Sequence, residues 1–236
     1  RRQRQMCIRD RLISDKLPVT LWLAALAFVI IIVVSIPLGV LWAGSKSRIL
    51  DGIIGFLTQL SMAVPSFFLG IIITYIFGII LKVFTPGSYI SYKDNFIGFI
   101  GYLIFPAISI AIPKIAMIAR FLRNSMLEQM NSDYVRTAYS KGCTRKRALF
   151  VHALKNAMMP VLTVIGMVIA EIVAGSIVVE QVFGLPGIGR LLISSISTRD
   201  LPVVEILVLY IAFVIIFVYF CLLYTSDAAD DRISVD

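Results

Sequence analysis

Residues 17–45 read LPVTLWLAALAFVIIIVVSIPLGVLWAGS, a stretch without a single Asp, Glu, Lys or Arg. A helix needs about 20 mainly apolar residues to cross the hydrocarbon layer of a bilayer, whereas apolar runs of about 10–14 residues are typical of buried helices in soluble proteins. In lipid the backbone N–H and C=O groups have no water to bond, so a spanning segment must satisfy them internally as a helix. The stretch therefore predicts a transmembrane helix.

Similar runs recur along the chain. Residues 52–81, 95–113 and 206–226 contain no charged side chain, and 158–179 is interrupted only by Glu171. The composition agrees, because 59% of all residues are hydrophobic and 15% are charged, against about 45–50% and about 25% in soluble domains. We predict an all-α, polytopic transmembrane helical bundle in this chain, with five spans at 19–43, 53–81, 97–120, 158–180 and 203–222.

The basic residues predict the orientation of these spans. Segment 120–155 contains eight Lys or Arg residues against two acidic ones, and connection 44–52 adds two more basic residues. Cytoplasmic loops of membrane proteins collect Lys and Arg. We therefore expect loops 44–52 and 121–157 to be cytoplasmic, and 82–96 and 181–202 to be external. Because this topology explains the net charge of +8, no nucleic-acid partner is expected.

The two ends of the chain differ from the rest. Residues 1–11 (RRQRQMCIRDR) and 221–236 (CLLYTSDAADDRISVD) resemble translated sequencing-adapter read-through. We interpret both as non-native segments flanking a membrane domain at 12–220; a basic arm and an acidic tail are the alternative. With Cys7 and Cys221 set aside, only Cys143 remains, a pattern that predicts neither a disulfide nor a metal site.

The long basic loop contains DYVRTAYSKG (133–142). Segment 134–141 contains good helix formers and is about two turns long, and Gly142 can take the left-handed conformation that ends a helix. Thr144 is expected to cap a second helix that begins at Arg145. A short helix, a tight turn and an amphipathic helix at the membrane surface would suit a groove on a cytoplasmic partner.

This segment resembles the EAA loop of ABC importer permeases, in which a short Ala-containing helix is followed after three residues by Gly. Ala138 and Gly142 occupy those places, whereas Thr137 departs from the small Ala. Other blocks resemble the dipeptide, oligopeptide and nickel branch of these permeases. They are ARFLRNSML (119–127), HALKNAMMPVLT (152–163), VEQVFGLPGIG (179–189) and RDLP (199–202). The resemblance runs from about Leu17 to Tyr219.

The resemblance implies that the short helix couples the membrane domain to a cytoplasmic ATPase. The coupling residues would be Tyr134, Arg136, Ala138, Lys141, Gly142 and Arg145. It also implies a second permease subunit, two ATPases that bind ATP and Mg, an extracytoplasmic binding protein, and a place in the bacterial cytoplasmic membrane. The family's permeases have six spans, and the first is expected to be missing here. Peptides, nickel or another small solute all remain open as cargo.

Further candidates lie outside this loop. Glu171 falls within a predicted span, where acids are rare and usually face a bundle interior or a wet cavity. It would line the pathway, pair with a residue such as Lys114, or be protonated and hydrogen-bonded to Ser or Thr. The outer gate or binding-protein side would include Glu180, Phe183, Pro186, Gly187, Gly189, Arg199 and Asp200.

No catalytic or metal-binding set is expected. His152 is the only histidine and has no acidic or Cys residue close in sequence, as a catalytic or metal site would need. FGLPGIG (183–189) lacks the Gly-Lys-Ser/Thr ending of a nucleotide-binding loop. The chain itself is therefore expected to bind no cofactor and to hydrolyse nothing. A channel or secondary transporter is the alternative from another class, but it leaves the loop at 133–142 unexplained.

Overall fold

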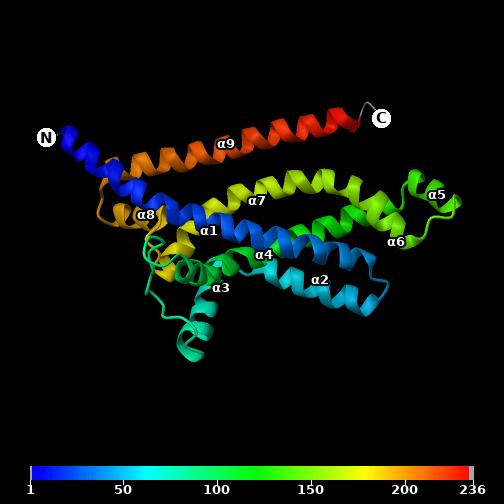
Figure 1. The fold of residues 1–236 in the computed structure, drawn as a ribbon, viewed down its shortest axis with the longest axis horizontal. Helices are drawn as coiled ribbons and strands as arrows, with labels where there is room; N and C mark the ends of the chain where they lie inside the picture. Colours follow the sequence, from blue (N-terminus) through cyan, green and yellow to red (C-terminus); the bar gives the residue numbers. More distant parts are fainter. Residues whose placement is uncertain (1, 234–236) are drawn as a thin grey trace. The chain divides into compact units, whose positions relative to one another are not determined.

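A computed structural model describes the backbone of residues 2–233 and the side chains of residues 13–220 (Figure 1). Within the described backbone every regular element is helical, which confirms the all-α prediction. The adapter-like segments have their side chains outside the described residues, so their interpretation stays a prediction. The elements are α1 (Arg2–Gly44), α2 (Arg48–Ala63), α3 (Ser66–Ile73), η1 (Thr74–Ile80), α4 (Phe96–Met130), α5 (Asp133–Ser140), α6 (Arg145–Arg147), η2 (Ala148–Ala153), α7 (Leu154–Phe183), α8 (Ile188–Ser197) and α9 (Leu201–Ile233).

Four helical stretches are long and apolar enough to cross a membrane. They are Ile13–Gly44, Phe96–Met130, Arg145–Phe183 and Leu201–Phe220. Each contains most or all of one predicted span. The third begins in α6 and continues through η2, a turn of π-helix, into α7. The polytopic architecture is therefore confirmed.

The predicted span 53–81 is wrong as a single helix. It is broken between α2 and α3, and it makes a fifth span only if the two pieces cross together. Val64 is extended (φ −92°, ψ 123°), and Pro65 follows with ψ 143°. A proline has no N–H to donate and disfavours a helical conformation in the residue before it. Pro106, by contrast, lies inside unbroken α4.

The chain divides into two compact units, and α1, α4, α7 and α9 contribute segments to both. The first contains the chain up to Ile30, Pro65–Ala111 and Ile169–Phe217. Its interior is rich in aromatic rings, including Phe99 and Phe183, each 1% exposed. The second contains Ile31–Val64, Ile112–Val168 and the chain from Val218 onward.

Close helix contact in the second unit depends on a glycine. A Cβ at Gly39 of α1 would lie 3.0 Å from the carbonyl oxygen of Ala119 in α4. Small residues allow helix backbones in membranes to approach closely, where packing rather than water expulsion drives association. The fully buried Leu122 and Met126 continue the α4 side of this core.

Candidate functional site

Helix α5 ends in a defined hydrogen-bonded turn. The Cys143 N–H donates to the carbonyl of Ala138 (3.1 Å), and the Gly142 N–H donates to the carbonyl of Tyr139 (2.9 Å). Gly142 has φ +82°, as predicted. These two bonds around a left-handed residue make a Schellman motif. Ala138 and Gly142 are therefore two fixed positions of one turn, which gives their four-residue spacing a physical reason.

One side of α5 is anchored and the other is open. Val135 is fully buried, and α5 packs against η2. The Tyr134 hydroxyl donates to Oε1 of Gln129 near the end of α4 (2.8 Å). Ala138 is half-buried, while Tyr134, Arg136 and Lys141 are exposed. The predicted coupling residues thus lie on a short helix and the turn that follows it, whose position is fixed by the chain itself.

Positive charge continues past this turn. Thr144 caps α6 as predicted, because its Oγ1 accepts from the Arg147 N–H (3.4 Å). Arg145, Lys146 and Arg147 are exposed. The Arg136–Asp133 pair (3.6 Å) is also exposed, with 75% and 98% of the two side chains accessible, so it adds little stability. The surface suits an acidic or polar groove.

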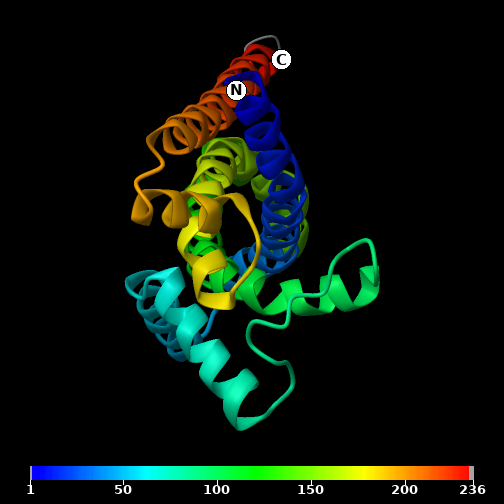
Figure 2. The same cartoon turned by 90° about the vertical axis from the view of Figure 1, so that its left-hand side faces the viewer.

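The end of α7 repeats the same turn. The Leu185 N–H donates to the Glu180 carbonyl (2.9 Å), the Gly184 N–H donates to the Gln181 carbonyl (3.3 Å), and Gly184 has φ +69°. After this turn the chain changes direction and continues into α8, drawn in yellow and orange (Figure 2). We call residues 180–190 the α7–α8 elbow.

Glu180, predicted on the outer-gate or binding-protein side, has a fully buried side chain within this chain. The carboxyl group accepts from the Thr20 hydroxyl (2.6 Å) and from the N–H groups of Gly189 (2.8 Å) and Arg190 (3.3 Å). Thr20 Oγ1 also accepts from the Ile188 N–H (2.9 Å). The first N–H groups of a helix have no partner inside it. Glu180 and Thr20 therefore cap α8, which explains the burial.

Glycines make room for this cap. A Cβ at Gly187 would lie 2.3 Å from the Glu180 carboxyl carbon, and one at Gly189 would lie 2.4 Å from the Cα of Ile177. The elbow is also held from α4, because the Tyr102 hydroxyl donates to the carbonyl of buried Phe183 (2.6 Å). Five predicted outer residues, Glu180, Phe183, Pro186, Gly187 and Gly189, are thus brought together.

Three predicted residues lie elsewhere. Arg199, with φ +57°, and Asp200 form the turn at the other end of α8. Arg199 is exposed and Asp200 is half-buried. Glu171 lies on α7 with an exposed side chain, so the interior of this chain does not bury it.

The sequence interpretation missed Thr20 and Tyr102. Both are polar side chains inside apolar stretches, which was the available signal. Their partners are 160 and 81 residues away, so no local pattern connects them with the elbow.

Comparison with known proteins identifies the family. Residues 35–235 match the model of the family described as binding-protein-dependent transport system inner membrane component. The chain belongs to this family. It is a multi-pass membrane protein and the permease subunit of an ABC importer.

Individual relatives are also named as permease proteins of transport systems. A putative peptide transport system permease protein of Brucella abortus (strain 2308) is 42% identical over 226 residues, which are 95% of this chain and 71% of that protein. The oligopeptide transport system permease protein AppB of Bacillus subtilis (strain 168) is 38% identical over 83% of this chain and 62% of its own length. A chain from the crystal structure of an amino acid ABC transporter with histidines shares the fold, with a TM-score of 0.71 at 17% identity, over 95% of this chain and 97% of that one.

Proposed function

We propose that this permease forms half of a pathway that carries peptides across the bacterial cytoplasmic membrane. A second permease subunit would supply the other half, and an extracytoplasmic binding protein would deliver the cargo. The names of relatives such as the Brucella protein and AppB favour peptides over nickel or another small solute. This chain would bind no cofactor, since ATP and Mg would be held by two cytoplasmic ATPases.

The observation that carries the coupling role is the geometry of α5. Its inner side is fixed through buried Val135 and the Tyr134–Gln129 bond, while the side chains of Arg136, Tyr139 and Lys141 are each exposed. Such a surface is pre-organised, so docking costs little ordering of the chain. In this proposal α5 lies in a cleft of an ATPase, and loops 44–52 and 121–157 are cytoplasmic.

Photo-crosslinking tests the docking directly. A benzoylphenylalanine at Tyr139, an exposed ring on α5, should crosslink this permease to the ATPase in the purified complex. The matched control is the same replacement at Tyr75, which is 57% exposed but lies on η1. Crosslinking to the ATPase from position 75, or from neither position, would contradict the assignment of α5.

Cargo is tested separately. Proteoliposomes that contain the complete complex should accumulate a labelled peptide when ATP and the binding protein are present. Accumulation of Ni²⁺ in place of peptide would reject the proposed cargo without affecting the role of α5.

A further inference from the structure

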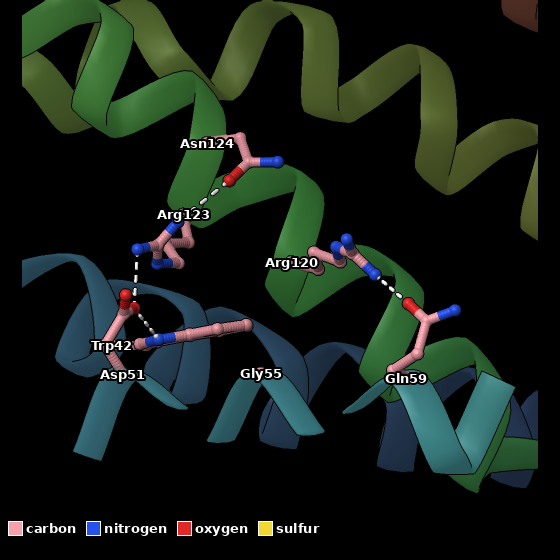
Figure 3. A pocket seen from close by; sticks show the side chains of 7 residues that line it. All are labelled: Trp42, Asp51, Gly55, Gln59, Arg120, Arg123 and Asn124. Carbon is pink, nitrogen blue, oxygen red and sulfur yellow. Dashed lines mark hydrogen bonds and ion pairs between the residues drawn. The ribbon is translucent and has the colours of Figure 1, made fainter. Parts of the chain in front are cut away.

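The second unit contains a polar pocket that the transport role does not explain. It has a volume of about 360 Å³ and lies among α1, α2 and α4, within the range of about 300–1,000 Å³ that is typical of small-molecule sites. Figure 3 shows its two arginines on α4 opposite Asp51 and Gln59 of α2. It is lined by Trp42, Asp51, Gly55, Gln59, Arg120, Arg123 and Asn124.

The acidic group of the pocket is already engaged. Oδ1 of Asp51 accepts from Arg123 (2.5 Å) and from the Trp42 indole N–H (2.7 Å). The Arg123 guanidinium also lies over the Trp42 ring, 4.9 Å from its centre. This arrangement neutralises Asp51 and fixes both of its partners.

Arg120 is the second arginine of the pocket, beside the Arg123–Asp51 pair. A guanidinium has five N–H donors in a planar fork that fits carboxylate and phosphate groups. Arg120 donates to Gln59 through Nη1, and its guanidinium makes no other hydrogen bond to a described residue. The side chain is exposed at the pocket. With two arginines against one aspartate, the pocket favours an anion.

The position of the pocket points to a membrane lipid. Trp42 lies near the end of α1, and Arg120 is the last residue of the span predicted within α4. Tryptophan and basic residues gather where a span meets water. A second, mainly apolar pocket of about 240 Å³ lies on the same α2–α4 seam. It is lined by Leu38, Ile54, Leu57, Thr58, Ser61, Ile112, Ile115 and Ala116.

The second pocket is displaced toward the middle of the spans. Leu38 is about one helical turn from Trp42 along α1, and Ala116 is about one turn from Arg120 along α4. Polar space at the interface is therefore followed by apolar space at greater depth. This is the order of headgroup and acyl chain in a phospholipid.

We propose that the α2–α4 seam binds one anionic phospholipid from the leaflet at whose surface α1 ends. Its phosphate would accept from Arg120, beside the Arg123–Asp51 pair, and one acyl chain would occupy the apolar pocket. Such a lipid would brace α2 against α4.

Trp42 provides the probe. The chain has two tryptophans, so Trp22→Phe leaves Trp42 as the only reporter. The full chain would be placed in lipid nanodiscs that contain acyl-brominated phosphatidylglycerol, or brominated phosphatidylcholine at the same fraction. We expect brominated phosphatidylglycerol to reach half-maximal quenching at a several-fold lower fraction.

Arg120→Gln should reduce this preference about fivefold, the effect of one basic side chain near an anionic surface. Arg147→Gln, which removes an exposed arginine of the same unit outside the pocket, should leave the preference unchanged. Equal quenching by the two lipids, or an unchanged preference in Arg120→Gln, would overturn the proposal.

Competition separates the possible anions. Unbrominated phosphatidylglycerol should relieve the quenching, whereas inorganic phosphate and trialanine should not. Relief by phosphate would mean a site for free anions, and relief by trialanine would mean a station on the cargo pathway. Either result would overturn the lipid assignment.

Discussion

The turn after α5 and the turn after α7 share one hydrogen-bond pattern in different surroundings. Each places a glycine at positive φ, Gly142 in one and Gly184 in the other. A Cβ on Gly142 would meet no atom within 4 Å, whereas at the elbow a Cβ on Gly187 would collide with the Glu180 carboxyl group. The local sequence specifies the same turn twice, but only the elbow is packed against other parts of the chain.

This difference predicts that substitutions at the two turns affect different properties, folding stability at one and transport at the other. At the elbow, buried N–H groups depend on side chains from distant parts of the chain, so changes there should lower folding stability. At α5 the open surface is completed by no described residue of this chain, so changes there should leave folding intact and affect transport. The following experiments test that division, beginning with the largest expected effect.

Glu180→Leu should be the most damaging change. It removes the acceptor of two backbone N–H groups, each costing about 1–3 kcal/mol when buried without a partner. We expect a large fall in melting temperature in detergent. Glu180→Gln, which keeps one oxygen acceptor, should be milder, and exposed Glu128→Gln is the control. If Glu180→Leu melts like the control, the cap does not stabilise the elbow.

Thr20→Val should have an intermediate effect. The substitution keeps the shape of the side chain but removes the hydroxyl that donates to Glu180 and accepts from the Ile188 N–H. An unsatisfied N–H at this site costs about 1–3 kcal/mol. The melting temperature should fall less than in Glu180→Leu. The double variant should lose less than the sum of the two losses, because both side chains cap the same helix end; full additivity would argue against a shared cap.

Gly142→Ala should change coupling rather than folding. A side chain in the left-handed conformation costs about 1–2 kcal/mol, and this strain falls on the exposed turn that positions α5. We expect a smaller fall in melting temperature than for the changes at the elbow, but weaker peptide-stimulated ATPase activity and uptake in proteoliposomes. Gly142→Asn should recover part of both, because Asn tolerates this conformation, and Gly142→Asp should uncouple most by adding a charge. Normal stimulated uptake in Gly142→Asp would count against a coupling role.

Arg136→Gln should have the smallest effect on stability. The Arg136–Asp133 pair is exposed, and such pairs contribute about 0–1 kcal/mol. Melting should therefore be close to that of the parent protein. ATPase binding at low salt should weaken if Arg136 faces the partner, because high salt screens exposed charges in parent and variant alike. A clear loss of melting temperature would show that α5 depends on its own surface charges, against the division drawn above.

The elements that could be predicted are those specified by nearby residues. Gly142 and Thr144 each act within four residues, so the end of α5 and the start of α6 were predicted correctly. The long apolar runs indicated the spans because a bilayer sets their length. Val64 and Pro65 break the second span, and the length of the apolar run did not predict this break.

The rest depends on contacts between segments far apart in sequence. Glu180 was placed among the outer-gate residues, and its burial as the cap of α8 was not predicted. Its partner Thr20 lies 160 residues away. Arg123 and Asp51 are 72 residues apart, and no local sequence pattern in either segment predicts their contact. Only the fold shows that these charges meet.

The π-turn η2 has a consequence for the direction in which α5 points. A π-helical turn holds about one residue more than an α-helical turn, so η2 holds about one residue more than a continuous α-helix from α6 into α7 would hold there. One residue of an α-helix corresponds to a rotation of about 100°. Removing one residue from 148–153 should let the segment relax to ordinary α-helix and swing α5, which packs on η2, by about that angle around the helix axis. The extra residue in η2 therefore helps to set the direction of α5 relative to the axis of α7.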